Sequence, residues 1–250
     1  MAELGFTYIV DKKCPLCDKM TRVTKYRSRL MSLGSDIDMC THYQDFNPYH
    51  YTVWICENCG YAGDENHFTK GLNARAKQKI QDFLNNRKVA FTYNQDRSLP
   101  EAVASYKLAI YYAEMTDDSL AHIAGLYLKL AWVFRIAGDP YHEEPMLRKA
   151  AEVYDRSLMT EDYPVGPLTD TMCEYLVGAI YFRLNDFETS TKYISRLVSD
   201  RNLQTMDRKL YDMARNLWQD LKEARDKARN DKSKEMAKDI KAAENAKKNS

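Results

Sequence analysis

Two matched cysteine pairs constrain this chain more than any other feature of its 250 residues. Cys14 and Cys17 lie in the segment CPLC, and Cys56 and Cys59 lie in CENCG. A spacing of two residues allows a tight turn that points both sulfurs and several backbone N–H groups at one ion. Two such turns, brought together by a small sheet, make a tetrahedral all-thiolate site. The sequence therefore predicts that these four cysteines hold one metal ion.

The predicted ion has a structural role, because four sulfurs fill a tetrahedral sphere and leave no open position for substrate. Zinc is the favoured ion, but a rubredoxin-like iron centre uses similar turns, so the sequence leaves iron open. Gly60 and Asp18 follow the two pairs, and both residue types tolerate the positive φ that such turns often need. The alternatives are four unrelated buried cysteines or two redox-active pairs.

Charge and hydropathy limit the possible partners and the expected cellular location of the protein. The net charge is only +1, so any attraction to nucleic acid or anionic lipid must be local. The N-terminal residues lack a secretory pattern, and no stretch approaches the roughly 20 apolar residues that span a bilayer. We therefore expect a cytoplasmic protein without membrane contact. Reducing conditions there favour metal ligation over disulfides.

A basic row lies between the cysteine pairs. Residues 21–30 alternate as in a strand, which puts Lys25, Arg27 and Arg29 on one face. Phosphate contacts through this row would make the chain a nucleic-acid-associated zinc-ribbon module. The competing interpretation is a solvated sheet face, because aromatic residues are not clearly interleaved with the charges.

The segment DIDMCTH offers a second group of metal-ligand residues, namely Asp36, Asp38, Cys40 and His42. Their spacing matches no closed metal site, and a lone cysteine is commonly a small buried hydrophobic residue. A second site at these residues stays open.

From about residue 72 the apolar residues recur with a helical period. The segment 120–137 is apolar nearly all round, so it needs neighbouring helices on two sides. The pattern predicts helices at 73–86, 99–115, 120–137, 142–159, 168–184, 187–199 and from 204 onward. We expect a metal-knuckle region at 1–70, a helical array at 71–221 and a charged helical or disordered tail at 222–250.

A degenerate repeat runs through these helices. Three segments share a small residue, a large one four positions on and a third contact three further: Ala102/Tyr106/Ala109, Ala150/Tyr154/Ser157 and Ser190/Ile194/Leu197. This pattern resembles stacked tetratricopeptide hairpins, although spacings of 48 and 40 residues replace the usual repeat of about 34. The predicted fold is mainly α, with a small β-rich, zinc-ribbon-like N-terminal region followed by an irregular tetratricopeptide-like array.

The tetratricopeptide resemblance also implies a binding groove, because the first helix of each hairpin lines the concave surface of such arrays. Carried over by position, that surface contains Leu128, Trp132, Arg135, Tyr175, Phe182 and Arg183. Aromatic and arginine side chains are typical of protein-binding surfaces. The alternative is that Trp132 and Phe182 pack between helices.

Segments from both parts of the chain together resemble a bacterial family known only as a conserved domain of unknown function. They are CPLC, SDIDMCTHYQDFNPYHYTVWICENCGYA (35–62), PEAVASYKLAIYYA (100–113), GLYLKLAWVFRIAGD (125–139) and MARNLWQDL (213–221). The resemblance covers most of residues 8–225. It implies a bacterial, cytoplasmic setting and supplies no established activity or catalytic residue.

These observations favour a non-enzymatic adaptor that is stabilised by metal and binds a protein segment through its helical array. The sequence contains no recognisable phosphate-binding glycine loop, nucleophile elbow or metalloprotease helix. The alternatives are the nucleic-acid module described above and electron transfer through bound iron. The oligomeric state is not indicated.

Overall fold

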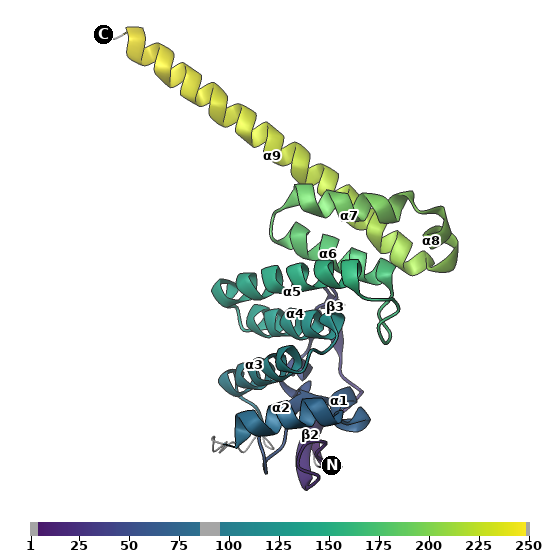
Figure 1. The fold of residues 1–250 in the computed structure, drawn as a ribbon. Coiled ribbons are helices and arrows are strands. Elements are labelled where there is room, and N and C mark those ends of the chain that lie inside the picture. The colour runs from purple at the N-terminus through teal and green to yellow at the C-terminus, as the bar shows by residue number, and fades with distance from the viewer. Residues whose placement is uncertain (1–4, 86–95, 249–250) are drawn as a thin grey trace. The chain divides into compact units, whose positions relative to one another are not determined.

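The computed structural model describes residues 5–85 and 96–248 of the chain, with side chains described through residue 230 (Figure 1). It divides into two compact units, residues 1–169 and residues 170–250. The predicted boundary between residues 70 and 71 lies inside the first unit.

The first unit begins with short strands. In the described part of the chain these strands pair as three antiparallel hairpins: β1 (Thr7–Lys13) with β2 (Met20–Tyr26), β3 (Ser32–Ser35) with β4 (Thr41–Tyr43), and β5 (Val53–Ile55) with β6 (Ala62–Asp64). Alternation along β2 buries Val23, and all three residues of β5 are buried. The ring of Trp54 meets that of Phe68 edge-on, with centroids 5.6 Å apart. Aromatic and β-branched residues thus give this region a small core of its own.

Two short helical segments complete the β-rich region. The 3₁₀ helix η1 (Pro48–Tyr51) is capped by Asn47, and helix α1 (Glu65–Lys70) is capped by Asp64, which accepts a hydrogen bond from the backbone N–H of His67. Helix α1 directly follows β6, so residues at the end of β6 and the start of α1 are fixed together.

In the described part of the first unit, the helices that follow are α2 (Ala74–Leu84), α3 (Leu99–Met115), α4 (Leu120–Ile136) and α5 (Pro140–Thr160). Helix α4 packs against both α3 and α5, which lie as successive layers in Figure 1. This arrangement buries Leu126 and Leu130 on one side of α4 and Leu128 on the opposite side. The all-round apolar character of this segment therefore has the predicted cause.

The β-rich region and helix α3 share one core. The hydroxyl of Tyr106 donates to the carbonyl of Tyr49 at 3.0 Å, and the hydroxyl of Tyr112 donates to the carbonyl of Gly60 at 3.1 Å. The guanidinium of Arg97 donates to the carbonyls of His50 and Val53. These contacts explain why residues 1–70 are not a separate compact unit.

The second unit contains α6 (Asp170–Arg183), α7 (Phe187–Ser199), α8 (Arg201–Met206) and α9 (Arg208–Lys248). Helices α6 and α7 approach closely at Gly178, whose carbonyl accepts a hydrogen bond from the hydroxyl of Ser190 at 2.7 Å. A Cβ at this glycine would lie 2.5 Å from Cδ1 of Ile194. The small residue is therefore required by helix contact.

Most predicted helices are present, with ends that differ by a few residues. The segment predicted to be helical from 204 onward is instead two helices, because Asp207 leaves the helical conformation and its carboxylate accepts a hydrogen bond from the N–H of Leu210 at 2.9 Å. The predicted tail at 222–250 begins within α9, which continues to Lys248. Among the described residues, none of the helices combines the length and the apolar character needed to cross a bilayer.

Candidate metal centre

Each cysteine pair lies in the turn of a hairpin. Cys14 and Cys17 connect β1 to β2, and Cys56 and Cys59 connect β5 to β6. The two turns have the same hydrogen bonds: the N–H of Asp18 donates to the carbonyl of Cys14 at 3.0 Å, and the N–H of Gly60 donates to that of Cys56 at 2.8 Å. Asp18 and Gly60 have the expected positive φ angles, 59° and 77°.

The four cysteine sulfurs lie close together. The Sγ atoms of Cys14 and Cys59 are 3.6 Å apart, those of Cys17 and Cys56 are 3.7 Å apart, and all four lie within 4.8 Å of one another. A disulfide would need about 2.05 Å. Four sulfurs bonded at about 2.3 Å to a tetrahedral ion would be about 3.8 Å apart. The observed spacing therefore fits a metal ion and not a pair of disulfides.

Polar contacts between the turns hold the two cysteine pairs in register. The backbone N–H of Glu57 donates to the hydroxyl of Thr21 at 3.1 Å, and the side-chain amide of Asn58 donates to the carbonyl of Met20 at 2.9 Å. Cys14 and Cys56 are buried. Contact with Cys56 raises the pKa of the Cys14 thiol to about 12, and the same contact lowers the pKa of Cys56. Such crowded thiols become four thiolates only when a cation compensates their charge.

The DIDMCTH segment is only partly brought together. Asp36, Cys40 and His42 have ligand atoms within 4.8 Å of one another, whereas Asp38 is turned toward Arg135. Nη1 of Arg135 also lies 2.7 Å from Asp36. A guanidinium already compensates the charge of these carboxylates, so the arrangement is explained without a second ion.

The predicted groove residues of the first unit are packed within their own chain. Leu128 is buried, and Trp132 is 8% exposed with its indole N–H donating to Asp38 at 3.2 Å. Arg135 contacts Asp36, Asp38 and Glu143 at 2.6 to 2.7 Å. Trp132 and Arg135 thus face the N-terminal segment of their own chain, and Leu128 is buried, so these side chains are not available to a partner. The packing alternative describes them better.

The predicted groove residues of the second unit also differ in exposure. Tyr175 is 2% exposed, whereas Phe182 and Arg183 are half-buried. The ring of Phe182 packs against that of Phe187, with centroids 5.6 Å apart. Tyr175 is therefore a core residue of this unit.

The basic row is only partly formed. Strand β2 ends at Tyr26, so Lys25 lies on the strand while Arg27 and Arg29 follow it. Lys25 contacts Glu65 at 2.8 Å, and Nε of Arg27 donates to the carbonyl of Gly5 at 2.9 Å. Arg29 is exposed. The three cations do not make one continuous row.

Comparison with known proteins places the chain in a family. A family model described as "Uncharacterized protein conserved in bacteria (DUF2225)" matches residues 8–221. The chain belongs to this family. The match confirms the resemblance that the sequence predicts, and it spans both cysteine pairs. No curated protein and no solved structure matches the chain. The family description states no activity, so function must be argued from the geometry.

Sequence reasoning missed one group of polar residues in the part of the chain that the family covers. Asp64, His67 and His122 lie with their ligand atoms within 4.8 Å of one another. The sequence did contain a signal: each histidine follows an aspartate by three or four residues, in DENH (64–67) and DSLAH (118–122). What the spacing could not show is that the two segments meet.

Proposed function

We propose that this chain is a metal-stabilised adaptor that binds a segment of another protein through its N-terminal β-rich region. Zinc is the structural ion in this proposal, because four thiolates are typical of closed structural zinc sites. A cytoplasmic setting accords with the lack of a disulfide among the cysteines that the structure describes. The adaptor proposal rests on one observation, which is a groove lined by aromatic residues of the β-rich region.

The groove has a volume of about 460 Å³ and lies between the first hairpin and the segment from η1 to α1. Its aromatic lining comes from three parts of the sequence and consists of Tyr8, Tyr26, and the neighbouring Tyr51 and Trp54. Tyr8 and Tyr26 are 39% and 41% exposed, while Trp54 is buried. Exposed tyrosines above a buried aromatic residue supply the rigid apolar area that protein-binding sites commonly use.

The charges of the groove favour a peptide over a polyanion. Lys25 and Glu65 both line it and contact each other at 2.8 Å, and Asp64 lies next to Glu65. The Glu65 carboxylate raises the pKa of Lys25. A nucleic-acid backbone would meet these carboxylates, whereas a peptide can place donors on Glu65 and an apolar side chain among the tyrosines.

One observation supports the nucleic-acid alternative. The guanidinium of Arg27 lies over the ring of Tyr8 at 5.5 Å, and the amine of Lys25 lies over the ring of Trp54 at 5.6 Å. Aromatic and cationic groups are thus closer together than the sequence suggested. Single strands bind to such combinations.

The tetratricopeptide-like array stays a proposal. The pairs α4–α5 and α6–α7 have extensive mutual contacts, and the small residues of the repeat template, Ala102, Ala150 and Ser190, are all buried. In this proposal the array is a support for the β-rich region and not the docking surface, because Trp132 and Arg135 are already engaged within the chain.

The adaptor proposal is tested by screening the zinc-loaded full chain against a displayed library of random peptides. We expect enriched peptides that bind the wild-type chain at least tenfold more tightly than Tyr8→Ala or Tyr26→Ala. Tyr141→Ala is the matched control, because Tyr141 is 82% exposed on α5 and lies outside the groove. Binding of the enriched peptides should be unchanged in this control.

Two outcomes contradict the proposal. Either no peptide is enriched, or enriched peptides bind Tyr26→Ala as tightly as the wild-type chain. A parallel filter-binding experiment uses a single-stranded DNA oligonucleotide at low and high salt. Retention at low salt that is lost at high salt and in Arg27→Ala would support the nucleic-acid alternative instead.

A further inference from the structure

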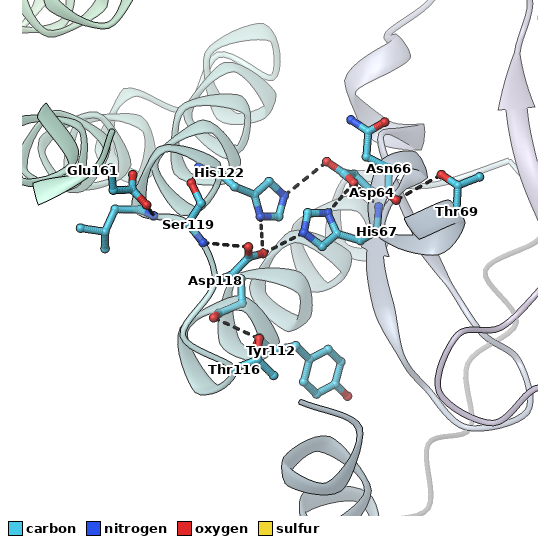
Figure 2. Close-up of polar contacts among 12 residues, drawn as sticks. Asp64, Asn66, His67, Thr69, Tyr112, Thr116, Asp118, Ser119, His122 and Glu161 are labelled. Carbon is cyan, nitrogen blue, oxygen red and sulfur yellow. Dashed lines mark hydrogen bonds and ion pairs between the residues drawn. The ribbon is translucent and has the colours of Figure 1, made fainter. Parts of the chain in front are cut away.

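Two histidine rings are stacked between two aspartates in the first unit (Figure 2). The ring centroids of His67 and His122 are 4.0 Å apart with an interplanar angle of 18°. Asp64 lies at one edge of this pair and Asp118 at the other. His67 comes from α1 and His122 from the first turn of α4. The cluster therefore joins the β-rich region to the helices.

Asp118 fixes the orientation of both rings. Its Oδ2 atom lies 2.8 Å from Nε2 of His67 and 2.7 Å from Nδ1 of His122. Its Oδ1 atom accepts a hydrogen bond from the N–H of Ser119, the residue that caps α4. A metal-binding histidine usually donates its second ring N–H to a carboxylate in this way.

The other two ring nitrogens face Asp64. Nδ1 of His67 lies 2.8 Å from Oδ1 of Asp64, and Nε2 of His122 lies 3.3 Å from Oδ2. Nε2 of His122 is buried, and its ion-pair contact with Asp64 is not a hydrogen bond among the described residues. A buried ring nitrogen without a hydrogen bond is costly unless something else binds it.

We propose that Asp64, His67 and His122 form a second metal site of the protein, which takes a divalent transition-metal ion such as zinc. The ligand atoms are Nδ1 of His67, Nε2 of His122 and a carboxylate oxygen of Asp64. Asp118 is the outer partner of both imidazoles. Two imidazoles and one carboxylate are a common ligand set for zinc and iron(II), whereas magnesium and calcium prefer oxygen ligands.

A divalent ion would make the net charge of the cluster zero. Two aspartates carry two negative charges, and one divalent ion with two neutral imidazoles balances them. Without metal, the same balance needs two imidazolium rings stacked 4.0 Å apart. A divalent ion replaces these two ring charges with one ion that lies between the ligand atoms.

A small cavity lies on the Asp118 side of the rings. Its volume is about 20 Å³, and its lining includes His67, Asp118 and His122 but not Asp64. This volume holds one water molecule. The cavity therefore borders the outer partner of the imidazoles, while three protein ligands leave one position of a tetrahedral metal sphere open to solvent.

The proposal is tested by elemental analysis of the full chain after loading with zinc and dialysis against metal-free buffer. We expect two zinc ions per wild-type chain, one at the cysteines and one at this cluster. Asp64→Asn is the principal variant, because asparagine still caps α1 but removes the ligand charge. It should retain one ion. Asp118→Asn should bind the second ion about 10- to 100-fold more weakly. His142→Asn is the control and should retain both ions.

A second measurement keeps the proposal falsifiable if a variant unfolds. Long-range ¹H–¹⁵N spectra of the wild-type chain report which ring nitrogens carry protons. We expect protons only on the two nitrogens that face Asp118, and a signal change when zinc is added to the metal-free chain. One zinc ion per wild-type chain, with all four ring nitrogens protonated, would overturn the proposal and leave a metal-free imidazolium pair.

Discussion

Replacing Arg135 tests whether this predicted groove residue stabilises the fold instead of binding a partner. Its guanidinium lies 2.6 Å from Asp38, 2.7 Å from Asp36 and 2.7 Å from Glu143. The side chain of Asp38 is fully buried, and that of Arg135 is 8% exposed. Burial lowers the pKa of Arg135, but Asp38 and Glu143 outweigh this and raise it. The guanidinium is therefore held in its charged form by the carboxylates.

Replacing Arg135 with methionine removes the cation and leaves the Asp38 carboxylate buried. Of the hydrogen bonds to Asp38 described above, the one from the Trp132 indole N–H remains. Breaking a buried ion pair from one side costs about 3–5 kcal/mol, because the other charge is left uncompensated. A domain of this size has a total stability of about 5–15 kcal/mol. The melting temperature of the variant should therefore fall by roughly 6–20 °C.

The assay is thermal unfolding of wild-type chain, Arg135→Met and a matched control, Arg148→Met. Arg148 contacts Glu144 at 2.7 Å, but both side chains are more than half exposed, so its loss should cost less than about 1 kcal/mol. Combining Arg135→Met with Asp38→Asn should recover part of the stability. If Arg135→Met melts with the control, the buried ion cluster does not stabilise the fold, and Arg135 returns as a candidate for partner binding.

Three further predictions follow from other parts of the structure. Gly178→Val should destabilise the second unit by about 1–3 kcal/mol through overpacking against Ile194. Gly125→Ala should not destabilise the chain in this way, because the atom nearest to its new Cβ lies 3.4 Å away. Equal melting temperatures of the two variants would refute the close contact at Gly178. Cys14→Ser combined with Cys56→Ser should abolish thiolate-bound metal. The near-UV circular dichroism of the buried Trp54 should weaken while most of the far-UV helical signal remains. An unchanged near-UV spectrum would contradict a structural role of the ion. Burial lowers the pKa of His50 below its usual value, so its native form resists protonation, and its contribution to stability is lost as pH falls below about 6.5. His50→Gln should therefore lose less stability than wild-type chain between pH 7 and pH 5 in urea unfolding, and identical losses would refute this assignment.

Local patterns carried most of what the sequence could predict. The spacing within each cysteine pair requires a tight turn, and the positive φ at Asp18 and Gly60 follows from that turn. The period of apolar residues located the helices to within a few residues, because burial on one or two faces is a local property of a helix. The segment 120–137 was apolar on all sides, and α4 indeed has neighbours on two sides.

Contacts between distant segments could not be predicted in this way. Arg135 meets Asp38 across 97 positions of the chain, and His67 meets His122 across 55 positions. A tryptophan and an arginine on one helix face are equally consistent with a partner groove and with an internal ion cluster. Only the fold shows that residues 36–38 occupy that face. The groove of the β-rich region was missed for the same reason, since its tyrosines come from β1, β2 and η1.

The ion held by four sulfurs is tested most directly by native mass spectrometry of the full chain. We expect the mass of one bound divalent ion to be lost when Cys14 and Cys56 are both replaced by serine, and the ion at the cysteines to remain in Asp64→Asn. A native mass equal to that of the bare chain, or one lowered by the hydrogens lost on forming two disulfides, would contradict the metal centre.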